Sequence, residues 1–255
     1  PTILSLALLT LLGSFVESSA NWPYWASDAA STRYVPFDQI HRGNVDSLRI
    51  LWRYRLPDAQ IVADEQDFEA ARYKGTPLVI DGVLYTVTPF GVALALDATT
   101  GEELWRFDTM GRYDDSTGQY LNRGVGYWSD EDGNTRILFG TWSDTLYSLD
   151  AKTGLPDPAF GDQGRVDLTQ GLRASVIKDR FGLASPPTIV GDVAIVGSII
   201  LDWHNGESPF HYVSPGDVRG YDVRTGEQLW RFHTIPQPGE IGWDQWEGTS
   251  WSHLG

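Results

Sequence analysis

The stretch LALDATTGEELWRF, at residues 94–107, occurs again in altered form as RGYDVRTGEQLWRF at residues 219–232. A third, more divergent copy, YSLDAKTGLPDPAF, occupies residues 147–160. Self-similarity of this kind is typical of repeat architectures, in which one structural unit recurs along the chain. The copies share an aspartate and a Thr-Gly pair at fixed offsets: Asp97, Thr100 and Gly101; Asp150, Thr153 and Gly154; Asp222, Thr225 and Gly226.

Each copy predicts a turn that leads into the outer strand of a small sheet. The aspartate side chain can accept backbone N–H groups within such a turn. In two copies a tryptophan follows, Trp105 and Trp230, and its large flat ring can dock between neighbouring sheets. Because a small sheet cannot bury both of its faces alone, neighbouring repeats must stack. The repeats therefore predict a β-propeller.

The sequence around the first copy, TPLVIDGVLYTVTPFGVALALDATTGEELWRF, predicts four strands. We expect them at residues 77–80, 83–88, 92–96 and 103–107, with Asp81-Gly82 as the first turn. The same pattern returns twice, so we expect an all-β fold, a β-propeller of four-stranded blades, with about three to four blades in this chain. Residues 44–56, NVDSLRILWRYRL, are expected to form a lone outer strand with its own Trp52, in a blade that the C-terminus completes.

Composition limits the classes of function. The chain has 255 residues, no cysteine and a formal net charge of -15. The absence of cysteine excludes disulfides and thiolate metal sites from this sequence. The negative charge argues against nucleic acid and anionic membrane surfaces as partners.

The N-terminus is expected to be a targeting segment. Residues 3–16, ILSLALLTLLGSFV, are apolar and uncharged and have the length of a signal-peptide core. Small residues in the following ESSA suit cleavage before Asn21. We expect a partial signal peptide at residues 1–20, a propeller domain at 21–255 and export to a bacterial periplasm. A buried N-terminal helix is the alternative. The initial proline predicts that the chain is a fragment or was processed before Pro1.

Four segments carry a resemblance to a known family. They are WPYWASDAASTRYVPFDQIHRGNVDSLRILWRY, TPLVIDGVLYTVTPFGVALALDATTGEELW, NRGVGYW and DVRGYDVRTGEQLWRFHTIPQPGE. Together they resemble the pyrroloquinoline quinone (PQQ)-dependent dehydrogenases, the quinoprotein alcohol and glucose dehydrogenase family. The resemblance implies the N-terminal part of an eight-bladed propeller in the periplasm, with membrane association left open. It also implies PQQ and calcium as cofactors, an alcohol or aldose sugar as substrate, and cytochrome c or ubiquinone as electron acceptor.

The resemblance implies roles for three residues near PQQ. Arg123 of NRGVGYW matches the arginine that pairs with a carboxylate of the cofactor, and a guanidinium fork suits a carboxylate. Ser185 lies in the segment whose hydroxyl groups bond the cofactor. Trp128 ends the NRGVGYW motif, as in the alcohol-oxidising members, and packing between blades is its alternative role.

The resemblance also implies a calcium ligand. Asp202, at the end of GSIILD, stands where alcohol-oxidising members have a glutamate that binds the ion, and calcium prefers such oxygen donors. The alternatives are that Asp202 merely begins a loop, or that Asn205 supplies the ligand. The catalytic aspartate base, the asparagine ligand and the tryptophan beneath PQQ are expected beyond Gly255.

A protein of another class remains as the rival. The same repeats build non-catalytic propeller scaffolds, such as those of outer-membrane assembly, and a fold alone does not separate the two. The long insertions between blades and the NRGVGYW segment favour the enzyme, because a scaffold has no evident need for either.

Overall fold

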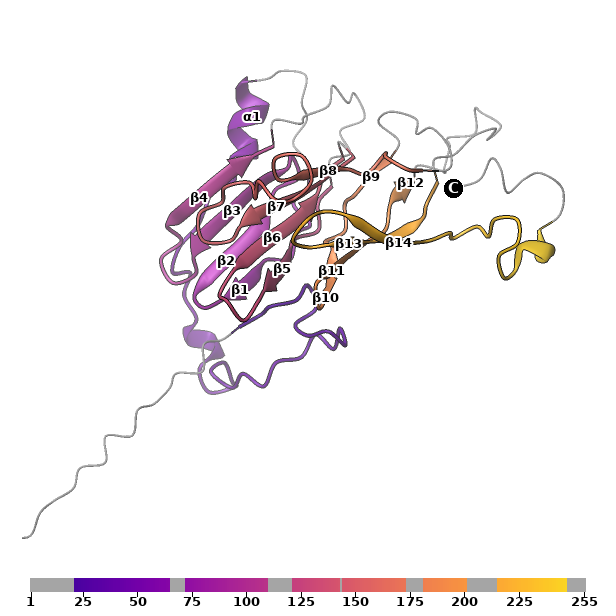
Figure 1. Ribbon diagram of the computed structural model, residues 1–255. Helices are drawn as coiled ribbons and strands as arrows, with labels where there is room; N and C mark the ends of the chain where they lie inside the picture. The colour runs from indigo at the N-terminus through magenta and orange to yellow at the C-terminus, as the bar shows by residue number, and fades with distance from the viewer. Residues whose placement is uncertain are drawn as a thin grey trace, which may run out of the picture.

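The computed structural model describes residues 21–64, 72–109, 121–142, 144–172, 181–200 and 215–246. The secondary structure in these ranges is almost entirely antiparallel β-sheet, as expected for an all-β fold. Three four-stranded sheets follow one another along the chain and stand side by side in space (Figure 1). The prediction of three to four four-stranded blades is thus confirmed.

The first sheet contains the quoted repeat and has the strand order β1-β2-β3-β4. Its strands lie within one residue of the predicted bounds because the turns that separate them were visible as Asp-Gly and Thr-Gly pairs. The bounds are β1 Leu78–Ile80, β2 Val83–Val87, β3 Val92–Asp97 and β4 Glu103–Asp108.

The second and third sheets repeat the same up-and-down order, and a two-stranded sheet lies beside them. The second sheet comprises β5 Gly126–Ser129, β6 Thr135–Gly140, β7 Thr145–Asp150 and β8 Arg165–Asp167. The third comprises β10 Thr188–Val190, β11 Val193–Val196, β13 Val218–Asp222 and β14 Gln228–Phe232. The two-stranded sheet pairs β9 Phe181–Gly182 with β12 Ile199–Ile200.

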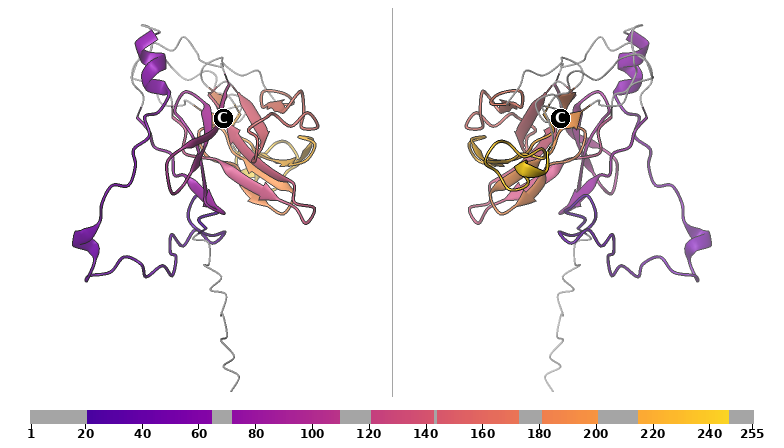
Figure 2. Two further views of the ribbon diagram at one scale, coloured as in Figure 1. Left: turned by 90° about the vertical axis from the view of Figure 1, so that its left-hand side faces the viewer. Right: turned by 90° about the vertical axis from the view of Figure 1, so that its right-hand side faces the viewer.

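Two hydrophobic cores lie between the sheets rather than within any one of them. The first core joins side chains of sheets one and two, among them Tyr85, Trp105 and Phe139. The second joins sheets two and three, with Leu138, Phe181 and Tyr221 among its members. The views in Figure 2 agree with this face-to-face packing. Each sheet therefore depends on its neighbour for burial, as in other repeat architectures.

The three Thr-Gly turns adopt one geometry. Asp97 Oδ1 accepts hydrogen bonds from the backbone N–H groups of Thr99 and Thr100 and from the Thr100 hydroxyl. The same bonds recur at the other two aspartates, Asp150 and Asp222. The glycine of each turn has a positive φ, for example 75° at Gly101, which an L side chain rarely adopts. The predicted role of the aspartate is confirmed.

The tryptophan of the first copy docks onto the turn of the next sheet, as predicted. Trp105 Nε1 donates to the Ala151 carbonyl at 2.9 Å. Its ring covers Gly154, where a Cβ atom would stand 2.5 Å from Trp105 Cδ2. Glycine in this turn therefore serves both the backbone conformation and the close approach of the ring.

Residues 44–56 do not form the predicted outer strand. The structure has a short 3₁₀ helix, η1 Val45–Ser47, followed by a chain without regular secondary structure. A strand needs a hydrogen-bonded neighbour, and among the described residues this segment has none. Trp52 nevertheless docks like Trp105, because its Nε1 donates to the Ala98 carbonyl at 3.1 Å and its ring covers Gly101.

Helices are minor elements in this structure. The remaining two in the described ranges are α1 Asp58–Asp64, drawn at the top of Figure 1, and the 3₁₀ turn η2 Trp243–Gln245. Neither they nor any other helix within the described ranges is long and apolar enough to cross a membrane. The expected signal peptide, residues 1–20, lies outside the described residues.

Candidate cofactor-binding site

The NRG segment before β5 forms a sharp and well-supported corner of the backbone. Asn122 is 3% exposed. Its Nδ2 donates to the Gly140 carbonyl at 2.8 Å, and its Oδ1 accepts the Gly124 N–H at 3.1 Å. Gly124 has a φ of 142°, and a Cβ atom there would stand 3.0 Å from the Thr76 carbonyl oxygen. The corner therefore requires both the buried amide and the glycine.

The backbone of Arg123 links all three sheets. Its N–H donates to the Ala184 carbonyl at 2.8 Å, just before the third sheet, and its carbonyl accepts the Thr76 N–H at 3.0 Å, just before the first. Because both backbone groups of Arg123 are engaged, its Cα position is fixed relative to the inner strands. The side chain itself is exposed. An arginine recognises a ligand well when its backbone is held in a fixed position and its guanidinium is free to bind.

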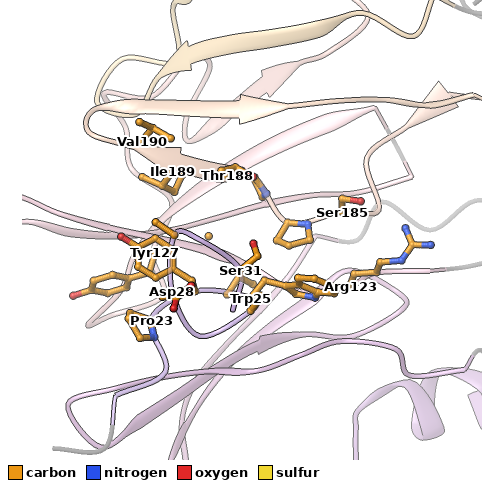
Figure 3. Close-up of a pocket in the computed structure, with 17 residues that line it drawn as sticks. Pro23, Trp25, Asp28, Ser31, Arg123, Tyr127, Ser185, Thr188, Ile189 and Val190 are labelled. Atoms are coloured by element: carbon orange, nitrogen blue, oxygen red, sulfur yellow. The ribbon is translucent and has the colours of Figure 1, made fainter. Parts of the chain in front are cut away.

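A cavity of about 360 Å³ opens beside this corner, between the inner strands β5 and β10 and residues 23–31 (Figure 3). Arg123 and Ser185 both line it, so two of the residues implied by the resemblance share one site. Trp25, Tyr127 and Ile189 form apolar parts of its wall. A largely apolar cavity with a few convergent polar groups is typical of small-molecule sites.

The charges at the cavity favour an anionic ligand near Arg123. Asp28 also lines the cavity, but its two carboxylate oxygens accept the backbone N–H and the hydroxyl of Thr32 at 3.0 and 2.5 Å. The Thr32 hydroxyl and N–H lower the pKa of Asp28, which keeps it ionised and engaged in its own turn. Arg123 has no ion-pair partner among the described residues. Its guanidinium is therefore available to an incoming carboxylate.

The structure places Trp128 away from this cavity. Its ring is 4% exposed and belongs to the core between sheets two and three. Trp128 Nε1 donates to Asp192 Oδ1 at 3.0 Å, and the guanidinium groups of Arg136 and Arg224 lie 5.2 and 4.7 Å from its ring. This is the inter-blade packing that the sequence left open as its alternative role. The neighbouring Tyr127 points to the other face of β5 and lines the cavity.

The implied calcium ligand lies outside the described residues. Asp202 and Asn205, its alternative, both fall in the range of 201–214. Within the part of the chain that the structure describes, no cluster of three or more His, Asp or Glu side chains could hold a metal ion. Asp202 and calcium therefore stay predictions.

Three residues of the site were missed by the sequence reasoning. Asn122 stands beside Arg123 in the quoted motif, and an asparagine before Arg-Gly could have suggested a structured corner. Trp25 and Tyr127 lie in the quoted WPYWASD and NRGVGYW segments, but the sequence analysis assigned them no role. They meet at the cavity only because residues 23–31, which are distant in sequence, lie beside β5 in the fold.

Comparison with known proteins identifies the family. The model of the PQQ family, described as the glucose/ethanol/alcohol dehydrogenase β-propeller domain, matches residues 22–254. The chain belongs to this family. The predicted resemblance is confirmed, and with it the fold, a partial propeller of four-stranded blades.

Curated relatives include enzymes for different substrates. The quinate/shikimate dehydrogenase (quinone) of Acinetobacter baylyi is 30% identical over 88% of this chain and 30% of its own length. The dehydrogenase subunit of alcohol dehydrogenase (quinone) from Gluconacetobacter polyoxogenes is 33% identical over 87% of this chain and 26% of its own length. The chain thus spans less than a third of these relatives, which differ in the substrates that their names give.

A solved structure agrees with the sequence relatives. The quinohemoprotein alcohol dehydrogenase from Comamonas testosteroni superposes with a TM-score of 0.63 at 27% identity, over 86% of this chain and 28% of that one. The europium-containing methanol dehydrogenase superposes with a TM-score of 0.63 at 21% identity, which supports the fold alone.

Proposed function

We propose that this chain forms part of a PQQ-dependent dehydrogenase that oxidises an alcohol or an aldose sugar and passes the electrons to cytochrome c or ubiquinone. The observation that carries the proposal is the Arg123 corner: the backbone of Arg123 is fixed at the junction of three sheets, and the residue lines one cavity together with Ser185. Family membership supports it. The relatives are named as dehydrogenases of alcohols, glucose and quinate or shikimate.

The residues of the site suit the cofactor. PQQ carries carboxylates, which Arg123 would bind through paired N–H groups, and Ser185 would add a hydroxyl donor. Bound PQQ supplies the hydride-accepting quinone that this chemistry requires. The contribution of this chain is to hold and orient one end of the cofactor and to screen it from water with the apolar wall. Asp202 is proposed as a calcium ligand from the resemblance alone.

The proposed location is the bacterial periplasm. The apolar, uncharged run at residues 3–16 and the small residues before Asn21 support export.

The test uses the longest reading frame that contains these residues, purified without cofactor and titrated with PQQ, with and without calcium. Tryptophan quenching reports binding, and dye reduction with ethanol, glucose and quinate reports turnover. Arg123→Ala should weaken PQQ binding at least about tenfold, because an ionic hydrogen-bonded contact is lost. Arg165→Ala is the matched control, since Arg165 is an exposed arginine whose side chain pairs with Asp162.

The outcomes separate the enzyme from the scaffold. Calcium-dependent binding with turnover of one of these substrates supports the proposal and begins to define the substrate. A protein that stays folded but binds no PQQ in either condition would refute it and favour the non-catalytic propeller. If Arg165→Ala weakens binding as much as Arg123→Ala, the assignment of Arg123 is wrong.

A further inference from the structure

Trp25 lies at the Arg123 end of the cavity, although the sequence gives it no role. It is one of the lining residues and is 37% exposed. A Cβ atom added to Gly124 would stand 3.6 Å from Trp25 Cδ1, so the indole reaches the NRG corner itself. Figure 3 shows the indole beside Arg123, on the side facing Tyr127. A partly exposed aromatic surface thus lies beside Arg123 at this end of the cavity.

The chain that precedes Trp25 is held in place by β1. Trp22 pairs with Val79 of β1 through two backbone hydrogen bonds of 2.7 and 3.1 Å. Asn21 bonds the Asp81 turn at the far end of that strand. Because the pairing with β1 is antiparallel, the chain runs from the Asp81 turn toward the Arg123 corner and reaches it at Trp25. The position of the indole along the cavity is therefore set by β1.

Residues 24–34, which we call the N-terminal loop, form two successive turns. Their hydrogen bonds fix the chain that follows Trp25. Ala26 and Ser27 are buried at 3% and 6% exposure. The Ser27 hydroxyl donates to the Tyr34 carbonyl at 2.7 Å, and the Arg33 N–H donates to the Ala26 carbonyl at 3.0 Å. The N-terminal loop contains positive φ values at three residues that are not glycine: Ser27, Ser31 and Arg33. Such conformations cost energy and persist where the surrounding contacts impose them.

A cation also supports the ring. The Arg33 guanidinium lies 5.0 Å from the centre of the Trp25 ring, a cation–π distance. Arg33 is not one of the residues that line the cavity. It therefore acts on Trp25 from outside the cavity and restricts the orientations that the indole can take.

We propose that Trp25 is a binding residue for the cofactor, an aromatic wall against which the flat ring system of PQQ packs when Arg123 holds its carboxylate. The inference rests on the proposed function and extends it to a residue that no comparison assigns. The ligand class is a planar aromatic anion: the charge is met by Arg123 and the ring face by Trp25. Arg33 is a positioning residue that acts through Trp25.

The experiment compares Trp25→Ala, Trp25→Phe and Arg33→Gln with the unchanged protein, in the same full reading frame and with PQQ as the probe. Packing between aromatic rings contributes an amount equivalent to about a two- to tenfold change in affinity. Trp25→Ala should therefore weaken PQQ binding about tenfold, and Trp25→Phe by threefold or less. Arg33→Gln should fall between the unchanged protein and Trp25→Ala.

A second readout distinguishes contact from a structural effect. A tryptophan that touches PQQ should be fully quenched by it, so Trp25→Phe should reduce the quenched fraction at saturating PQQ. Tyr34→Leu is the matched control, because Tyr34 belongs to the N-terminal loop, is 69% exposed and does not line the cavity. Circular dichroism checks that each variant is folded, and Trp25→Phe serves if Trp25→Ala does not fold.

The outcomes separate the two proposals. If the unchanged protein binds PQQ, Arg123→Ala weakens binding and the Trp25 variants match the unchanged protein in affinity and quenching, this inference is wrong and the proposed function stands. If the unchanged protein does not bind PQQ, both fall. Equal losses of PQQ affinity in Tyr34→Leu and Trp25→Phe would show that the N-terminal loop affects binding only through folding. That result would also overturn the role of Trp25.

Discussion

The two interfaces between neighbouring sheets solve the same packing problem with different chemistry. Between sheets one and two, Trp105 docks on the Thr-Gly turn and lies 6.1 Å from the Tyr85 ring. This interface is so well removed from water that burial raises the pKa of Tyr85 to about 12. Between sheets two and three, the buried aromatic rings include Trp128, which has two arginines against it.

The difference follows from one position on the outer strand. In β4 the docking residue is Trp105, but in β8 the corresponding contact with the next turn comes from Val166, whose Cγ2 would stand 2.7 Å from a Cβ atom on Gly226. A valine covers much less of the turn than an indole. The side chains of Arg136 and Arg224 lie against Trp128 at the second interface and form ion pairs with Asp157 and Asp192. A fold repeat thus preserves the geometry of the turn and leaves the chemistry of the contact free to vary.

The largest predicted effect separates the two docking residues. Trp105→Ala should lower the free energy of unfolding by about 3–5 kcal/mol, because it removes a large buried ring and its hydrogen bond. Val166→Ala, the matched change at the second interface, should lower it by about 1 kcal/mol. Urea unfolding followed by circular dichroism measures both. Equal losses would show that the two interfaces are not chemically different at this position.

A smaller effect is expected from Arg136, a partly buried arginine of the second interface. The Arg136 side chain is 14% exposed, pairs with Asp157 and donates to the Val223 carbonyl at 2.7 Å. Arg136→Met should lower the free energy of unfolding by about 2 kcal/mol, since it leaves Asp157 and the carbonyl without their charged partner. Arg165→Met, which removes an exposed pair, should change it by less than about 0.5 kcal/mol. The same urea experiment applies, and a loss for Arg165→Met as large as for Arg136→Met would contradict this ranking.

The smallest effect concerns the exposed pair of Arg224 and Asp192. A hydrogen bond from Arg224 is the main cause that lowers the pKa of Asp192 from its ordinary 3.8. A carboxyl group whose pKa is lowered by folding stabilises the protein above the ordinary value, and this stabilisation is lost as the pH falls through the lower value. Thermal melting should therefore show Arg224→Gln slightly below the unchanged protein at pH 7.

Acid and salt sharpen that comparison. The difference between Arg224→Gln and the unchanged protein should disappear at a pH well below 3.8, where Asp192 is protonated in both. It should also shrink in about 1 M salt, which screens exposed pairs. A difference that persists in strong acid would mean that Arg224 stabilises the interface by packing on Trp128 instead.

The repeats made the fold predictable, because their turns are written in residues with strong local preferences. Asp97, Thr100 and Gly101 define both the position and the hydrogen bonds of a turn. The outer strand expected at residues 44–56 was wrong, because a strand needs a neighbouring strand to pair with and the local sequence does not supply one. Trp52 still shows the predicted docking, which depends on the turn alone.

The site was predictable only where a motif carries it. Arg123 and Ser185 were found through the resemblance, and the structure brings them to one cavity. Trp25 was not found because its proximity to Arg123 arises from the pairing of Trp22 with β1, which no local pattern reveals. Trp128 illustrates the converse, since it stands in the same motif as Arg123 but packs in the core between two sheets.

The docking contacts also give the chain a direction. Trp52 reaches Ala98 and Trp105 reaches Ala151, in each case 46 residues further along the sequence. A nascent chain therefore presents each of these indoles well before the turn that will cover it has been synthesised. Sheets should be completed in order from the N-terminus, each waiting for its successor, and a pause in translation just after one of these tryptophans would prolong the exposure of the ring. The sequence spacing between docking partners thus sets how long each indole waits for its partner during synthesis.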